Sequence, residues 1–289
     1  MSDTLFEMKE LQKPKVFLSS LTFNDGSVIP LAENCIVVFT GANNTGKSQI
    51  LKDIEHFFDM QCNLKPIVVS NIEKEYYGSF TDEFFKSRFY PNVNGELLVY
   101  ESPHYSYRME NVINSWKNKQ LSGSLYKLFV KLIDTEHRLL TSKPLQRTQN
   151  PETHPIYKLH KSEQLVQILS GYFKQAFDVD LEVNRNEMID IPLHVGNAPC
   201  KKDYTIDEQD LYYNEIAKMP RLQEQGDGMR SFASVLLDTF TSEYTITLID
   251  EPEAFLHPPQ ARLLGKMLVT HNPDNAYITI LFCRYRQTS

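Results

Sequence analysis

The chain has 289 residues, of which 41% are hydrophobic and 23% are charged, proportions typical of folded globular proteins rather than disordered or fibrous ones. This length suffices for one large α/β domain, or for a core domain that carries a substantial insertion. The formal net charge of −7 argues against a chain-wide basic surface of the kind that drives binding to nucleic acids, although a local basic patch remains compatible with it.

The cysteines and the apolar segments indicate the cellular compartment. The four cysteines are far apart and form no CxxC pair, which favours free thiols over a zinc site or a disulfide framework. They are Cys35, Cys62, Cys200 and Cys283. The first residues lack the apolar stretch of a signal peptide, and no segment approaches the roughly 18 apolar residues of a membrane span. We therefore expect a cytoplasmic protein.

The first part of the chain predicts a hairpin, a buried strand and a helix. Residues 15–23, a turn-like NDGS and VIPL are typical of a β-hairpin. Residues 35–40 (CIVVFT) form an unbroken apolar run, which predicts a strand buried on both faces of a parallel sheet. After GANNTGKS, apolar residues recur at helical spacing through Phe57 and Phe58.

The middle of the chain is less regular. Residues 65–70 (KPIVVS) suggest a second strand, and residues 71–107 are aromatic-rich without a clear period. Apolar spacing in 108–142 and 156–177 predicts mostly helix, separated by a linker in which Pro144, Pro151 and Pro155 would break any helix. Residues 179–195 alternate like strands returning to the sheet. We accordingly divide the chain into 1–70, the first lobe of a core domain; 71–178, a mainly helical insertion; and 179–289, the second lobe.

The loop that follows the buried strand has the pattern of a phosphate-binding loop. Its two glycines are four residues apart, and Lys and Ser follow the second. In such a loop successive backbone N–H groups and a helix N-terminus face the phosphates of ATP, the lysine reaches the β- and γ-phosphates, and the serine hydroxyl binds Mg²⁺. The alternative is a glycine-rich turn with a chance Lys-Ser pair. The predicted ATP-binding residues are Gly41, Ala42, Asn43, Asn44, Thr45, Gly46, Lys47, Ser48 and Gln49.

An apolar strand near the C-terminus ends in two carboxylates. Residues 245–251 read TITLIDE. At the carboxyl edge of a parallel sheet, Asp250 would lie near the Mg²⁺ bound by Ser48, and Glu251 would polarise a water molecule that attacks the γ-phosphate. We therefore predict Asp250 and Ser48 as metal ligands, and Glu251 and Lys47 as catalytic residues. The alternative is an acidic strand end that faces solvent.

The residues after Glu251 carry a family resemblance. GANNTGKS together with DEPEAFLHP resembles the ABC-type ATPases of the SMC, RecF and OLD-like group, over about residues 15–55 and 180–282. The resemblance implies an α/β P-loop NTPase fold of the ABC-ATPase head type, and a homodimer whose heads enclose two ATP molecules. It also implies that a segment before the acidic strand contacts the γ-phosphate held by the opposite head. The matching residues here are Gly226, Gly228 and Arg230, and His257 would lie in the loop that crosses the dimer interface.

This sequence departs from the family pattern in two places. Gly226 stands where the family has a serine, which leaves backbone N–H groups and Arg230 as donors. The family also expects a Thr-His pair after the strand at 276–282, whereas the sequence continues CRYRQTS; we interpret it as a C-terminally truncated or frame-shifted form, and Thr270-His271 as part of a turn. The metal-sensing glutamine of the family has only Gln146 and Gln149 as positional candidates.

The expected function is that of an ATP-hydrolysing head that regulates a partner. The motifs most resemble the Septu and retron-associated anti-phage defence ATPases, which implies a nuclease partner such as an HNH protein. The alternatives are a DNA-repair or chromosome-organising ATPase of the RecF or SMC type, and a regulatory module that binds ATP without hydrolysing it. Residues 116–161 are basic, with Trp116 and Tyr126 interleaved, which suggests either a DNA-binding face or a solvated helix surface.

Overall fold

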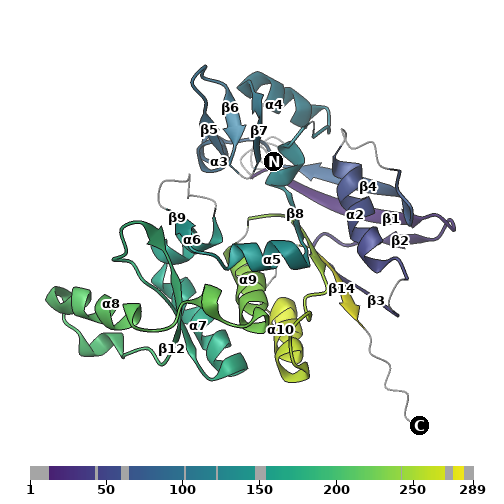
Figure 1. The fold of residues 1–289 in the computed structure, drawn as a ribbon. Coiled ribbons are helices and arrows are strands. Elements are labelled where there is room, and N and C mark those ends of the chain that lie inside the picture. The colour runs from purple at the N-terminus through teal and green to yellow at the C-terminus, as the bar shows by residue number, and fades with distance from the viewer. Residues whose placement is uncertain are drawn as a thin grey trace, which may run out of the picture. The chain divides into compact units, whose positions relative to one another are not determined.

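The computed structural model describes residues 13–42, 45–59, 65–100, 102–121, 123–146, 154–241, 243–270 and 276–282 (Figure 1). The chain forms two compact units. The first takes its described residues from Met1–Leu132, Glu243–Asp250 and Pro273–Ser289, and the second from Ile133–Ser242 and Glu251–Asn272. These boundaries cut across the three segments expected from the sequence.

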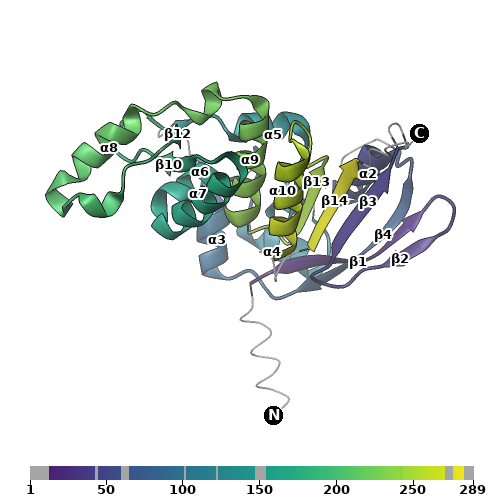
Figure 2. The same ribbon diagram turned by 90° about the horizontal axis from the view of Figure 1, so that it is seen from below.

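The first unit is built on a four-stranded sheet. Its order is β3 (Ile36–Gly41), β14 (Ala276–Phe282), β13 (Ile246–Asp250) and β8 (Val130–Ile133), and β14 runs parallel to both of its neighbours (Figure 2). Helix α2 (Lys47–Phe58) follows β3 and contacts β3, β14 and β13. Its buried apolar residues include Ile50, Leu51, Ile54 and Phe58. The strand and the helix predicted on either side of the phosphate loop are therefore confirmed.

The environment of β3 differs from the expectation. The sequence predicted a strand buried on both faces, but β3 ends the sheet order and Val38 keeps 43% of its surface exposed. An apolar run alone does not distinguish an edge strand from a central one, because both are enriched in β-branched residues. The most deeply buried strand described in this sheet is instead β13, whose residues Ile246, Leu248 and Ile249 are completely buried.

A second sheet of the first unit has the order β2-β1-β4. Strand β1 (Lys15–Phe23) pairs antiparallel with β2 (Val28–Pro30), which confirms the predicted hairpin, and with β4 (Val69–Tyr77). The strand predicted at 65–70 thus begins later and extends further than expected. Thr245 connects the two sheets, since its Oγ1 donates to the Val16 carbonyl oxygen at 2.7 Å.

The aromatic-rich region forms part of the same core. It contains α3 (Asp82–Arg88), the antiparallel strands β5 (Phe89–Pro91), β6 (Leu97–Val99) and β7 (Ser102–Tyr107), helix α4 (Met109–Lys117) and the 3₁₀ turn η1 (Leu125–Leu128). The Trp116 ring packs against Tyr76, Phe80 and Phe129, and its Nε1 donates to the Gly78 carbonyl oxygen at 3.0 Å. The helical prediction for 108–142 is wrong at Val130–Ile133, which join the core sheet as β8.

The second unit is mainly helical. Helix α9 (Asp227–Thr241) lies at its centre and contacts α5 (Thr135–Thr141), α6 (Pro155–Lys161) and α7 (Glu163–Phe177) (Figure 1). Helix α10 (Pro258–Thr270) packs on α7. Helices α6 and α7 confirm the helical pattern of 156–177, but Pro155 is the first residue of α6 rather than a break, because a proline at that position loses no helical hydrogen bond.

The strands of the second unit form small sheets of their own. Strand β10 (Asp180–Val183) pairs with β12 (Leu193–Gly196), and β11 (Asp190–Ile191) pairs with β9 (Leu145–Gln146), all antiparallel. The expectation that residues 179–195 return to the core sheet is therefore wrong. Helix α8 (Gln209–Ala217) and the 3₁₀ turns η2 (Lys201–Asp203), η3 (Ile206–Glu208) and η4 (Leu222–Glu224) complete the unit.

Two further observations concern the cysteines and the helices. Among the described cysteines, Cys35 and Cys200 are free thiols, while Cys62 and Cys283 lie outside the described residues. Within the described part of the chain, no helix combines the length and the apolar character that crossing a membrane requires.

Candidate functional site

The predicted phosphate loop lies between β3 and α2 in the first unit. Gly41 is the last residue of β3, and Lys47 is the first residue of α2. Gly46 precedes the helix with a left-handed backbone (φ 84°), a conformation that glycine adopts without steric cost. A Cβ atom on Gly46 would lie 3.3 Å from Cγ2 of Val68, so a side chain here would also crowd the segment before β4.

The Lys47 side chain folds back along the loop. Its Nζ donates to the carbonyl oxygens of Ala42 at 2.7 Å and Gly41 at 3.1 Å, and the residue is only 8% exposed. Thr45 Oγ1 donates to the same Ala42 carbonyl oxygen at 2.9 Å. The ammonium group is thus held within the turn at the start of α2, where an anion would be stabilised by both the charge and the helix N-terminus.

Ser48 and Asp250 meet at the carboxyl edge of the sheet. The strand register aligns Asp250 with Ile280 and Ile280 with Phe39, which is close to the end of β3. Ser48 Oγ donates to Asp250 Oδ1 at 3.0 Å. A serine hydroxyl and a carboxylate are both oxygen donors, which suits Mg²⁺, an ion that commonly takes one or two protein ligands and completes its shell with phosphate oxygens and water. The predicted pair of metal ligands therefore lies together.

Asp53 supports this site and was not identified from the sequence. It is buried on α2, and its Oδ2 accepts hydrogen bonds from the backbone N–H groups of Ile67, Val68 and Val69 at 2.6–3.0 Å. Its Oδ1 accepts from Gln49 Nε2 at 2.7 Å, so the Gln49 amide is engaged within the unit. These bonds fix the segment that faces Gly46. The only sequence signal was a carboxylate among the apolar positions of an amphipathic helix.

Glu251, where the chain returns to the second unit after β13, has an unusual backbone conformation. Its φ is +46°, in the left-handed region that non-glycine residues rarely adopt, and Phe255 follows with φ +68°. The Glu251 carbonyl oxygen accepts a 2.8 Å hydrogen bond from Nη1 of Arg138, a completely buried arginine on α5. Because Asp250 and Glu251 belong to different units, the predicted role of the Glu251 carboxylate next to the γ-phosphate stays a prediction.

The signature-like segment at Gly226–Arg230 leads into helix α9. Gly226 is exposed just before the helix, and a Cβ atom there would meet nothing within 4 Å. Gly228 lies against the segment after the acidic strand, since a Cβ atom there would be 2.8 Å from the Phe255 carbonyl oxygen. The Arg230 guanidinium turns into its own unit, where Nη2 donates to the Leu139 carbonyl oxygen at 2.9 Å and Nη1 to Asp227 Oδ1 at 3.1 Å. The exposed donors of this segment are thus backbone N–H groups near Gly226, rather than the Arg230 side chain.

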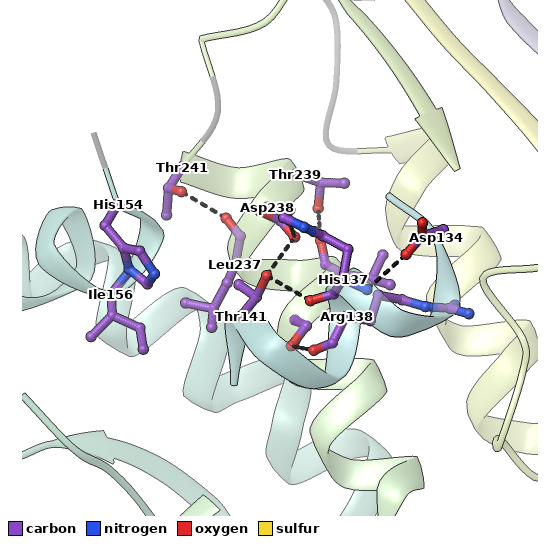
Figure 3. Close-up of polar contacts among 12 residues, drawn as sticks. Asp134, His137, Arg138, Thr141, His154, Ile156, Leu237, Asp238, Thr239 and Thr241 are labelled. Atoms are coloured by element: carbon purple, nitrogen blue, oxygen red, sulfur yellow. Dashed lines mark hydrogen bonds and ion pairs between the residues drawn. The ribbon is translucent and has the colours of Figure 1, made fainter. Parts of the chain in front are cut away.

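Helix α5 is tied to α9 by polar contacts (Figure 3). The buried carboxylate of Asp238 accepts from Thr141 Oγ1 at 3.4 Å and lies 3.9 Å from His137 Nε2. Ser234 Oγ donates to the carbonyl oxygen of Arg138. Asp134 caps α5 by accepting from the His137 N–H at 2.7 Å. The sequence did not predict these contacts, because no sequence pattern indicates that α5 and α9 pack against each other.

The remaining predicted residues are placed as follows. His257 is exposed just before α10, and its N–H donates to Gln260 Oε1 at 2.9 Å. Gln146 is exposed in β9. Thr270 is the last residue of α10 rather than part of a turn. Asn43, Asn44, Gln149 and His271 lie outside the described residues, so their predicted roles and the turn expected at His271 stay predictions.

The two aromatic residues singled out in the basic stretch at 116–161 are not exposed to solvent. Trp116 and Tyr126 are 8% and 5% exposed, and both belong to the apolar core of the first unit. Stacking on bases requires an open ring face, so these two residues do not form a single-strand binding platform. The interpretation of this stretch as a DNA-binding face loses its aromatic component.

The fold belongs to a known structural class. The parallel strands β3, β14 and β13, a glycine-rich loop between β3 and α2, and an acidic strand end beside that loop are the features of an α/β P-loop fold. The fold class predicted from the sequence is confirmed at this level. No model of a known protein family matches the chain, and no curated protein sequence matches it.

A solved structure of an SMC head shares this fold. The SMC head bound to the C-winged helix domain of ScpA matches with a TM-score of 0.52 and 12% identity, covering 92% of this chain and 90% of that chain. The SMC head domain from Thermotoga maritima (12% identity, 94% and 90% covered) and a Pyrococcus furiosus Smc head with an extended coiled coil, bound to the C-terminal domain of ScpA (10%, 93% and 90%), give 0.39 and 0.46. These last two scores are too low to add to the argument. At such identities the likeness establishes the fold alone.

Proposed function

We propose that this chain is an ATP-binding and ATP-hydrolysing head that acts as a homodimer around two Mg·ATP molecules. The observation that carries the proposal is the 3.0 Å contact between Ser48 and Asp250 beside the Lys47 loop. It unites the three groups that the chemistry needs, which are a cation for the phosphates, a hydroxyl ligand and a carboxylate ligand for the metal.

Each residue then has a defined role. Lys47 leaves its loop carbonyls to bind the β- and γ-phosphate oxygens, and the loop N–H groups orient the triphosphate. A magnesium ion held by Ser48 and Asp250 would neutralise charge on the phosphates. Glu251 accepts a proton from water as the water oxygen bonds to the γ-phosphorus and the bond from that phosphorus to the ADP oxygen breaks.

The second half of the site would come from the other copy. The start of α9 carries exposed glycine backbone at Gly226, and a helix N-terminus of this kind favours an anionic group. Because Arg230 is bonded to Leu139 within its own unit, we assign the contact with the opposite γ-phosphate to backbone N–H groups. His257 is exposed and remains available to the same interface.

ATP turnover by the purified chain tests the proposal. We expect Mg²⁺-dependent phosphate release that Glu251→Gln reduces by about 100-fold or more, in line with the loss of a catalytic base. The Glu251→Gln chain should also dimerise with ATP in light-scattering measurements, and Lys47→Ala should abolish that dimer. Equal phosphate release by the wild-type and Glu251→Gln chains would remove the enzymatic proposal.

The regulated partner is proposed from the motifs. Their resemblance to anti-phage defence ATPases favours a nuclease of the HNH type, acting in the cytoplasm. Purification of the tagged chain from cells that express its genomic neighbours, followed by mass spectrometry, tests this assignment. A nuclease retained with wild type and released from Lys47→Ala supports it, whereas recovery without any nuclease contradicts it.

A chromosome-organising or DNA-repair head is the second candidate. The fold of the SMC head bound to ScpA favours it, while each described helix here has 15 residues or fewer, far shorter than a coiled coil. DNA binding whose affinity falls steeply with salt would support this candidate. A third candidate is a module that binds ATP without hydrolysis, favoured by Gly226 in place of serine, and the turnover measurement above separates it.

A further inference from the structure

Arg138 is the largest completely buried side chain of the described residues, at 0% exposure. Burying a guanidinium is unfavourable unless hydrogen bonds compensate for its lost hydration, so Arg138 requires hydrogen-bond partners. The Arg138 guanidinium donates to two acceptors in the second unit. Nη1 donates to the Glu251 carbonyl oxygen at 2.8 Å, and Nη2 donates to Thr135 Oγ1 at 3.0 Å.

The bond to Glu251 meets a strained backbone. A left-handed glutamate, here with φ +46°, is strained and persists only where surrounding contacts hold it. Arg138 supplies such a contact from α5, more than 100 residues earlier in the chain. Since the φ and ψ of Glu251 set the direction of its side chain, the arginine acts on the carboxylate through the main chain.

Helix α5 is in turn held by the signature-like helix. Arg230 Nη2 donates to the Leu139 carbonyl oxygen, and Ser234 Oγ donates to the Arg138 carbonyl oxygen. Asp238 accepts a hydrogen bond from Thr141 (Figure 3). Three successive turns of α9 thus contact α5. A shift at the start of α9 would therefore move the arginine that holds Glu251.

We infer that Arg138 is a positioning residue, which sets the backbone of Glu251 for water activation and transmits to it the state of the signature-like segment at Gly226–Arg230. The inference rests on the proposed ATPase function. Arg138 would thereby connect two composite sites. The α9 segment of one head would contact the ATP held by the partner head, whereas Glu251 would act on the ATP of its own head.

Steady-state ATP turnover of the full chain tests this inference with Arg138→Met and Arg138→Lys. We expect Arg138→Met to lower kcat by about 10- to 100-fold, because small displacements of a catalytic group cost that much. The KM for ATP should change by less than about threefold, since the phosphate loop is untouched. Lysine keeps one donor and should restore part of the rate. In a Glu251→Gln background, Arg138→Met should slow the reaction by less than about twofold, because it acts through Glu251.

The matched control is Arg88→Met. Arg88 is also a buried arginine, and its Nη2 donates to the Leu128 carbonyl oxygen at 2.9 Å, but it lies in the first unit. The inference is overturned if Arg138→Met lowers kcat no more than Arg88→Met does. It is also overturned if Arg138→Met lowers kcat by the same factor in the Glu251→Gln background as in wild type. It also fails if neither Arg138 variant folds. If wild type itself turns over no faster than Glu251→Gln, the proposed function fails, and the inference fails with it.

Discussion

Ser48 Oγ and Asp250 Oδ1 lie 3.0 Å apart, although 202 positions separate the two residues in the sequence. The parallel sheet explains this proximity. Strand β14 pairs with β3 on one side and β13 on the other, so the carboxyl ends of β3 and β13 share an edge. Metal and phosphate ligands commonly gather at such an edge of α/β sheets.

The pair predicts how magnesium affects nucleotide binding. In thermal denaturation, saturating Mg·ATP should stabilise wild type by about 3 kcal/mol at 100 times the dissociation constant. Ser48→Ala should keep the stabilisation by ATP alone and lose the increment due to Mg²⁺. Ser27→Ala is the matched control, because Ser27 is an exposed serine that bonds an aspartate, Asp25, in a surface turn. A normal Mg²⁺ increment in Ser48→Ala would contradict the assigned metal site.

Asp53 predicts a large structural effect. Asp53→Ala leaves three backbone N–H groups and the Gln49 amide without their acceptor; the bond from the Val69 N–H is buried, and a buried unsatisfied donor costs about 1 to 3 kcal/mol. We expect urea denaturation to show a loss of about 1 to 3 kcal/mol in the free energy of unfolding. Lys52→Ala, the exposed neighbour on the same helix, should change stability by less than about 0.5 kcal/mol. Similar losses in both variants would refute the role given to Asp53.

The sequence predicted those parts of the fold whose information is local. The unbroken apolar run predicted β3, the helical spacing of apolar residues predicted α2, and the glycine loop defines the junction between them. The sequence predicts helix at β8 because VKLI is short, contains Lys131, and lies between apolar residues at helical spacing. Its strand conformation is imposed by the neighbouring β13, which is a tertiary effect.

The supporting residues of the site could not be predicted for the same reason. Arg138 reads as one of several basic residues in a helical stretch, and Asp53 as a polar interruption of an apolar face. Their roles depend on acceptors and donors far along the chain, at Glu251 and at residues 67–69. For Trp116, the sequence suggested a function that the structure does not support. An aromatic ring among lysines suggested a binding face, but the ring is buried in the core.

Gly226 predicts a gain of activity. Its φ is outside the left-handed region, and a Cβ atom meets nothing within 4 Å, so serine fits there without strain. We expect Gly226→Ser to change the free energy of unfolding by less than about 0.5 kcal/mol. The added hydroxyl donor should raise kcat for ATP by about two- to tenfold, because it can bond the opposite γ-phosphate. Unchanged turnover in a folded Gly226→Ser chain would show that this position does not face nucleotide.

At Gly228, by contrast, we expect an added side chain to destabilise the chain. Gly228→Ala places a methyl group 2.8 Å from the Phe255 carbonyl oxygen, and backbone must move to relieve it. Overpacking of this kind costs about 1 to 3 kcal/mol in the free energy of unfolding. The control is Gly171→Ala within α7, where the methyl group meets nothing and should stabilise the helix by about 0.5 to 1 kcal/mol. Equal stabilities of the two variants would contradict the close approach at Gly228.

Glu182 predicts the pH dependence of stability. Burial raises the pKa of its carboxyl from 4.5 to about 7, while Arg185 and Lys201 oppose the rise. A raised pKa means that the folded state favours the neutral acid, so the stability it contributes is present below pH 4.5 and is lost as pH rises through 7. Relative to wild type, Glu182→Gln should therefore gain about 2 to 3 kcal/mol in the free energy of unfolding between pH 4.5 and 7.5.

Urea denaturation across that pH range measures the difference between the two chains. Glu215→Gln is the control, because Glu215 is exposed and its pair with Lys218 on the surface contributes less than about 1 kcal/mol. The wild-type and Glu215→Gln curves should run parallel with pH, whereas Glu182→Gln should diverge from both above pH 4.5. A Glu182→Gln curve parallel to wild type would mean that the Glu182 carboxyl ionises in the folded chain as it does in water.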